Sequence, residues 1–175
     1  MKNIAKDNYS LQRMSPSQWR EYKSIRLEAL KTNPDLFGSN YDKEVLYNEI
    51  DWTSLLENDS RAMFALYHAK LLVGLTGITL KKDDATTAIM FASFIKLPHR
   101  GRGLSKLFYQ ARIDWARQKR CKSIIVSHRV GNASSKAAIQ QFGFKYSHAE
   151  QVKWPDGVWA EELIYLLELN PEDHS

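Results

Sequence analysis

The chain has 175 residues, enough for one compact domain with a real core, and we expect a single domain over residues 1–175. Hydrophobic residues make up 43% and charged residues 26%, which is typical of a soluble globular protein. The net charge of +5 admits an anionic partner. A single cysteine, Cys121, excludes an intrachain disulfide and favours a cytoplasmic location. The apolar runs are too short to span a bilayer, so we expect no membrane partner.

The first third of the chain predicts one strand and two helical stretches. Residues 9–14 alternate as a short strand does. Ser15-Pro16-Ser17-Gln18 is a capping box with proline at the first helical position, so a helix is expected to start there. Asn33-Pro34 should end it, because the residue before a proline avoids the α region. A weaker helical stretch covers 41–56, with a break expected near Asp51.

The rest of the chain predicts an antiparallel meander, a strand–helix–strand crossover, a short helix and a hairpin. The expected strands are residues 62–67, 71–80, 85–95, 122–128, 145–154 and 158–169. An amphipathic helix follows residues 99–106, and a short helix over 134–142 is closed by Gly143. This order predicts an α/β (mixed α+β) fold: a seven-stranded mixed, mostly antiparallel sheet with about four helices on its faces.

The segment Arg100-Gly101-Arg102-Gly103-Leu104-Ser105-Lys106 carries the clearest chemical signal. It lies between a strand and a helix, where glycines let the backbone approach a ligand and the first helical turn directs free N–H groups at it. Nine Lys or Arg and one acidic residue, Asp114, occur between positions 99 and 129. This pattern is typical of a pyrophosphate site, although a basic surface loop before a helix would look the same. It is neither a P-loop nor a dinucleotide fingerprint.

These residues resemble the GNAT acyltransferases, whose pyrophosphate loop reads Arg/Gln-x-x-Gly-x-Gly/Ala. Here it reads Arg100-x-x-Gly103-x-Ser105, with serine as a small departure at the last position. Asn132, Ala138 and Phe142-Gly143-Phe144 resemble the family's Asn…GF block. The element order is also similar, and together the matches cover nearly the whole chain.

The resemblance implies an N-acetyltransferase with acetyl-CoA as co-substrate, and it implies roles for individual residues. The backbone at Phe94 and Ile95 would pair with the pantetheine arm as an added strand does. The amides of residues 101–106 would hold the pyrophosphate, with positive charge from Arg100, Arg102 and Lys106. Asn132 would contact the CoA arm or a water, unless it serves as a helix cap.

The general base is not where the family often has it, because no acid lies between Ala85 and Gly103. Two substitutes are visible. Glu161 falls on the apolar face of the last strand, where a carboxylate would be a suitable base, unless that face is wet. His128 ends the preceding strand, although a lone histidine at a strand end is more often structural.

The usual acid of the family is also missing. A tyrosine that protonates the departing thiolate often lies one helical turn before the Gly-Phe pair, and here that position is Ile139. Three explanations remain open: another donor replaces the tyrosine, catalysis has been lost, or a thiol of pKa about 8.5 leaves well enough as the anion. We favour the third explanation.

The acceptor is not fixed by the sequence, and a small-molecule or peptide amine is expected. Acidic and aromatic residues between positions 41 and 49 could bind a cationic amine or form a solvated surface. No metal is expected, because the histidines are scattered: His68, His99, His128, His148 and His174. A CoA-binding sensor without catalysis is the main alternative. A basic nucleic-acid-binding module is less favoured, because most aromatic residues fall in core positions. A homodimer stays open.

Overall fold

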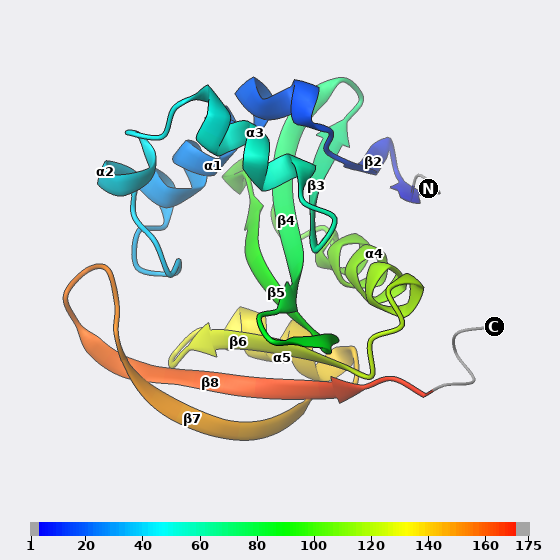
Figure 1. The fold of residues 1–175 in the computed structure, drawn as a ribbon, viewed down its shortest axis with the longest axis vertical. Helices are drawn as coiled ribbons and strands as arrows, with labels where there is room; N and C mark the ends of the chain where they lie inside the picture. The colour runs from blue at the N-terminus through cyan, green and yellow to red at the C-terminus, as the bar shows by residue number, and fades with distance from the viewer. Residues whose placement is uncertain (1–3, 171–175) are drawn as a thin grey trace.

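The computed structural model describes residues 4–170 and contains one eight-stranded sheet in the order β1-β2-β3-β4-β5-β6-β8-β7. Figure 1 shows the strands with helices on both sides of them. The strands are β1 (Ile4–Lys6), β2 (Tyr9–Arg13), β3 (Arg61–His68), β4 (Leu71–Lys81), β5 (Asp84–Ile95), β6 (Ser123–Arg129), β7 (Lys145–Lys153) and β8 (Trp159–Glu168). The expected mixed seven-stranded sheet is confirmed from β2 to β8, and the three-residue β1 extends it at one edge.

The helices follow the expected order with one difference. The α-helices are α1 (Trp19–Thr32), α2 (Tyr41–Glu44), α3 (Glu49–Glu57), α4 (Ser105–Gln118) and α5 (Ala133–Gln141). The capping box at Ser15 is confirmed and opens a short 3-10 turn, η1 (Pro16–Gln18), directly before α1. A second 3-10 turn is η2 (Leu97–His99). The break expected near Asp51 lies earlier, because Asn48 and Asp51 form the capping box that begins α3.

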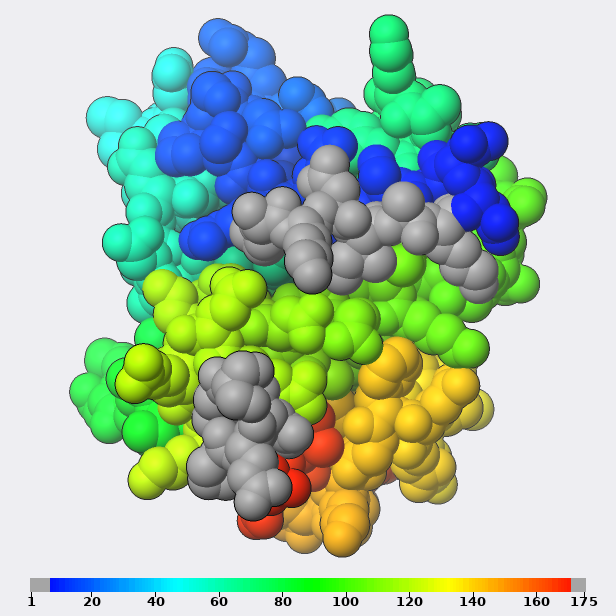
Figure 2. Space-filling model, turned by 90° about the vertical axis from the view of Figure 1, so that its right-hand side faces the viewer, coloured from blue at the N-terminus to red at the C-terminus, as the bar shows by residue number. Residues whose placement is uncertain are grey.

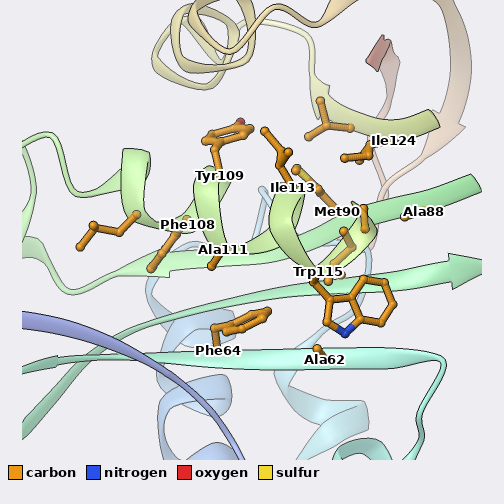
Figure 3. Close-up of a cluster of buried hydrophobic side chains, with 14 of the residues drawn as sticks. Ala62, Phe64, Ala88, Met90, Phe108, Tyr109, Ala111, Ile113, Trp115 and Ile124 are labelled. Atoms are coloured by element: carbon orange, nitrogen blue, oxygen red, sulfur yellow. The ribbon is translucent and has the colours of Figure 1, made fainter. Parts of the chain in front are cut away.

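The central strands β3 and β4 are covered on both faces of the sheet, which explains their continuous burial. Along β3, Phe64 and Leu66 belong to one apolar cluster, whereas Met63 and Ala65 belong to the other. Side chains of successive strand residues point to opposite faces, so a strand covered on both sides is buried at consecutive positions. Helix α4 covers one face, and α1 and α3 cover the other. Figure 3 shows Trp115 of α4 lying beside Ala62 of β3, on the face of the sheet that also carries Phe64.

The sheet divides into two parts between β5 and β6. These parallel strands pair over only three positions, from Thr87–Ser123 to Ile89–Ile125, although both strands continue beyond Ile89 and Ile125. In Figure 1, the axes of β3 to β5 lie roughly upright, whereas those of β6 to β8 lie across the molecule. The carboxyl ends of β5 and β6 therefore separate, and the segments that follow them begin on either side of an opening.

Cys121 lies in the turn between α4 and β6 and is fully buried in the core cluster. Burial raises the pKa of its thiol, and nearby Asp84 acts in the same direction. This position indicates a structural role for the cysteine, because a buried thiol behaves as a small hydrophobic group.

Candidate active site

A pocket of about 380 Å³ lies where the two parts of the sheet separate. Three elements supply most of its lining: the end of β5, the loop and first three turns of α4, and the start of α5. Asn33, Leu36 and Phe37 from the segment after α1 close one side. In the space-filling view of Figure 2, the yellow-green residues of the loop and α4 lie between the blue N-terminal part and the orange and red C-terminal strands.

Most of the predicted cofactor-binding residues line this one pocket. They are Phe94, Ile95, Arg100, Gly101, Gly103, Leu104, Ser105 and Asn132. Of the expected set, Arg102 and Lys106 are not among the described lining residues, and both are exposed. The sequence pattern therefore locates one contiguous surface, built from segments that are about 40 residues apart in the chain.

The N-terminus of α4 is suited to hold an anion. Gly101 and Gly103 have φ values of 76° and 73°, a conformation that side chains with a Cβ disfavour. Helix α4 begins after Leu104 with neither a side-chain cap nor an acidic residue in its first turn. The Lys106 and Leu107 amides donate to the Gly103 and Leu104 carbonyls at 3.4 and 3.0 Å, so the earlier amides of this turn, such as that of Ser105, are the donors for an anion, which the helix dipole also favours. A pyrophosphate group fits these donors.

Arg100 holds the loop in place as well as adding charge. Its Nε donates to the Ile95 carbonyl at 2.6 Å, and a terminal nitrogen donates to Asn33 Oδ1 at 2.9 Å. The end of β5, the loop and the end of α1 are thereby connected. The sequence pattern suggested the charge of Arg100 but not this bracing function.

Asn132 caps α5, and it also lines the pocket. Its Oδ1 accepts from the Ser135 amide at 3.3 Å and from the Ser134 hydroxyl at 3.2 Å. Both alternatives for this residue are therefore compatible with the structure, because capping uses the amide oxygen and leaves the side-chain N–H groups for a ligand. Ser134 and Ser135, at the N-terminus of α5, also line the pocket, so the N-termini of α4 and α5 both contribute to it. The first turn of α5 contains no acidic residue that would oppose binding of an anion there.

His99 connects the same loop to the first part of the sheet. Its Nδ1 lies 2.7 Å from the Tyr9 hydroxyl, and the rings of Tyr9, His68 and His99 form a cluster. Burial lowers the pKa of His99, and the neighbouring His68, Arg102 and Lys96 lower it further. His99 is therefore neutral at physiological pH.

The two expected catalytic residues lie outside the pocket lining. Glu161 is exposed on β8, and neighbouring Trp159 is 64% exposed, so of the two alternatives for this carboxylate the wet face is the one that the structure has. The reason is that β8 extends past its covering residues at this end. His128 is buried, with Nδ1 2.8 Å from the Arg129 carbonyl and Nε2 3.1 Å from the Tyr165 hydroxyl. Both of its ring nitrogens already have partners.

Two residues that the sequence analysis did not single out lie at the end of the pocket beside β5. Arg112 of α4 is only 2% exposed, yet it lines the pocket, and it donates to the Ser93 hydroxyl at 3.2 Å. Ser93 follows Ala92, whose φ of 60° marks a bulge where two residues of β5 oppose Thr76 of β4. In the sequence, Arg112 could have been recognised as a charged residue on the otherwise apolar face of α4. Nothing in the sequence marks the bulge.

Ile139 does not line the pocket, although its neighbour Ala138 does. It is 1% exposed and packs in the core cluster. Among the described residues, no group of three or more His, Cys, Asp or Glu could hold a metal ion. His174 lies outside the described residues. No helix within residues 4–170 is long and apolar enough to cross a membrane.

The family model of the acetyltransferase (GNAT) family matches residues 14–144. The chain therefore belongs to the GNAT acetyltransferase family, whose general activity is acetyl-CoA-dependent acetyl transfer. A comparison with curated protein sequences finds no match.

Solved structures of this family have the same fold. The ribosomal-protein-S5-alanine acetyltransferase from Vibrio fischeri has a TM-score of 0.81 at 10% identity, over 98% of each chain. The structure of yncA from Salmonella typhimurium with its cofactor acetyl-CoA has a TM-score of 0.78 at 14% identity, over 94% of this chain and 96% of that one. A GNAT-family acetyltransferase from Streptococcus pneumoniae has a TM-score of 0.77 at 15% identity, over 92% and 99%.

Proposed function

We propose that this chain transfers the acetyl group of acetyl-CoA to a primary amine of a small molecule or peptide, by direct attack in a ternary complex. The observation that carries the proposal is the pocket, whose lining includes the N-terminal residues of two helices together with Ser93. Acetyl-CoA would supply an activated acyl group. The residues of the α4 loop would hold its pyrophosphate, and the end of β5 would lie along its pantetheine arm.

The proposed acceptor side is formed by the segment after α1. Leu36 and Phe37 line the pocket, and this segment leads to the acidic first turn of α2, with Asp42 and Glu44. Glu44 is already paired with Arg26 at 2.9 Å, so Asp42 is the more available carboxylate for a cationic amine. None of the described lining residues is Asp or Glu, and we propose that water takes the proton of the amine.

The same lack of a carboxylate supports a second candidate, a CoA-binding sensor without turnover. Two experiments separate the candidates. First, acetyl-CoA should raise the melting temperature, because a ligand of the native state stabilises it by mass action, whereas NAD, ATP and phosphate should do much less. No shift at millimolar acetyl-CoA would contradict both candidates.

Second, a panel of polyamines, aminoglycosides, amino acids and peptide N-termini is tested for CoA release with a thiol reagent. Acetylated product from any member supports the enzyme, and binding of acetyl-CoA without turnover of any member supports the sensor. A cytoplasmic location, supported by the single cysteine, and a homodimer belong to the proposal as predictions.

A further inference from the structure

Arg112 is a buried cation beside the pocket without a carboxylate partner among the described residues. Its Nε donates to the Phe108 carbonyl at 3.1 Å, its Nη1 donates to Ser93, and its guanidinium lies 4.8 Å from the centre of the Tyr109 ring. All three partners are neutral. A buried charge without an opposite charge is costly, and an anion that binds or forms in the pocket would offset this cost.

The charge of Arg112 persists at neutral pH. Burial lowers its pKa to about 10, and Tyr109 acts in the opposite direction. Burial also raises the pKa of Tyr109, so its hydroxyl stays protonated and does not neutralise Arg112. The pocket therefore has a permanent positive charge in its lining, in addition to the exposed arginines of the loop before α4.

Ser93 connects Arg112 to the pocket through a hydrogen bond. Its Oγ accepts from Arg112, which has no acceptor atom, and lies 2.8 Å from the hydroxyl of the fully buried Thr76. A serine hydroxyl can accept two hydrogen bonds and donate one. With Thr76 as donor, both acceptor positions of Ser93 are filled and its own hydrogen is left for the pocket. Ser93 is exposed there, so a ligand can reach this hydrogen.

We propose that Ser93, held and polarised by Arg112, donates a hydrogen bond to the sulfur of CoA and so stabilises the leaving thiolate. This inference rests on the proposed acetyl transfer. The acceptor nitrogen forms a bond to the acyl carbon, the carbon–sulfur bond breaks with its electron pair on sulfur, and the amine proton passes to water. Ile139 offers no proton at this step, so a thiolate that leaves as the anion needs a positive environment. Arg112 does not contact the sulfur in this step; it positions and polarises Ser93.

The first test measures the thiol pKa of bound CoA from its thiolate absorbance in the ultraviolet, which requires no acceptor. The wild-type protein should lower this pKa by about one unit or more relative to free CoA, or about tenfold in ionisation constant. Arg112→Met, which keeps the length of the side chain, and Ser93→Ala should each remove most of that shift. Lys119→Met, which removes a positive charge just after the same helix, should retain it.

The second test compares turnover of acetyl-CoA with that of its selenium analogue, whose selenolate leaves more easily. Arg112→Met should lower kcat for acetyl-CoA by about tenfold to a hundredfold, with KM for the donor within about threefold. The loss should be much smaller for the selenium analogue, and Arg112→Lys should recover part of it. A merely structural role would lower both rates equally.

The outcomes separate the two proposals. If the wild-type protein does not bind CoA, both proposals fail. If it binds CoA and acetylates an amine, but the bound thiol has the same pKa in the wild type and in Arg112→Met, only this inference is overturned. If Arg112→Met does not fold, Ser93→Ala decides alone, with a melting curve to verify its fold, because it removes the proposed donor and retains Arg112.

Discussion

Arg129, the last residue of β6, donates a hydrogen bond from Nη1 to a carboxylate oxygen of Asp156 at 2.7 Å. The same nitrogen donates to the Asp35 carbonyl at 3.0 Å, and the guanidinium lies 5.3 Å from the centre of the Trp154 ring. Asp156 is at the tip of the β7–β8 hairpin, and Asp35 directly precedes the pocket residue Leu36. Figure 1 shows this hairpin curving toward the segment between α1 and α2. One arginine thus joins the two sides of the proposed acceptor entrance.

Loss of this connection should weaken acceptor binding and leave donor binding unchanged. We expect Asp156→Asn to raise KM for the amine by about threefold to tenfold, because a partly exposed charged contact is of modest strength. The dissociation constant of acetyl-CoA should stay the same by calorimetry. Glu150→Gln, which removes an exposed ion pair with His148 on the same hairpin, is the matched control. An equal effect of both variants would assign the change to the hairpin in general.

The Arg129–Asp156 contact should be insensitive to pH in the physiological range. The hydrogen bond from Arg129 lowers the pKa of Asp156, and the Val158 amide adds to this effect. A carboxyl group with a lowered folded-state pKa stabilises the fold above its unfolded pKa and loses that contribution as the pH falls through the folded value. KM for the amine, corrected for the ionisation of the amine itself, should therefore be flat from about pH 8 to pH 5. A rise near pH 6 would contradict the assignment.

Gly103 should not tolerate a side chain. Gly103→Val should weaken acetyl-CoA binding by at least a hundredfold, because the new side chain strains a backbone with φ of 73° and enters the space of the pyrophosphate. Gly157→Val places the same strain at φ of 84° in the hairpin turn and should leave acetyl-CoA affinity unchanged. Calorimetry on both variants, with melting curves to verify folding, measures the difference. Unchanged affinity in Gly103→Val would remove the loop from the site.

Glu161 and His128 should respond differently to substitution. Glu161→Gln should change kcat by less than about threefold, since the side chain is exposed and outside the pocket. His128→Ala should destabilise the fold by about 1–3 kcal/mol, because it leaves the buried Tyr165 hydroxyl without its partner. Thermal unfolding and a pH–rate profile check both expectations. A large loss of kcat in Glu161→Gln, with a shifted acidic limb, would instead identify Glu161 as the base.

A tyrosine at position 139 should not restore an acid. Ile139 is fully enclosed, so Ile139→Tyr would overpack the core at a cost of about 1–3 kcal/mol without placing a hydroxyl in the pocket. We expect a lower midpoint in urea and no gain in kcat. Ile139→Leu, which conserves volume, should cost less than about 1.5 kcal/mol. A gain in kcat of a hundredfold would show that protonation of the thiolate limits the protein.

Local sequence patterns predicted the elements well, because each depends on neighbours in the chain. The capping box at Ser15 and the apolar positions of α4 are examples. The helix break expected near Asp51 was misplaced although the local signal was present. Asn48 and Asp51 form a second capping box, which shows that a new helix begins after Asn48. The position of the glycine-rich loop before α4 was predictable for the same reason, because glycine, charge and helix start are adjacent in the sequence.

Features that depend on distant contacts were not predictable. The bulge at Ala92 depends on the register with Thr76, and the exposure of Glu161 depends on where the cover of β8 ends. The contact of Arg129 with Asp35 joins residues 94 positions apart. Alternation along a strand indicates which residues share a face, but whether that face is covered is decided by the rest of the fold.

The enclosure of Cys121 has a practical consequence for enzymology. Its sulfur is shielded from solvent, and its raised pKa keeps it in the unreactive thiol form. A disulfide reagent added during turnover should therefore record only the CoA released, with no background from the native protein. On unfolding, one equivalent of thiol should appear, so the same reagent would also count the fraction of molecules that have lost their core.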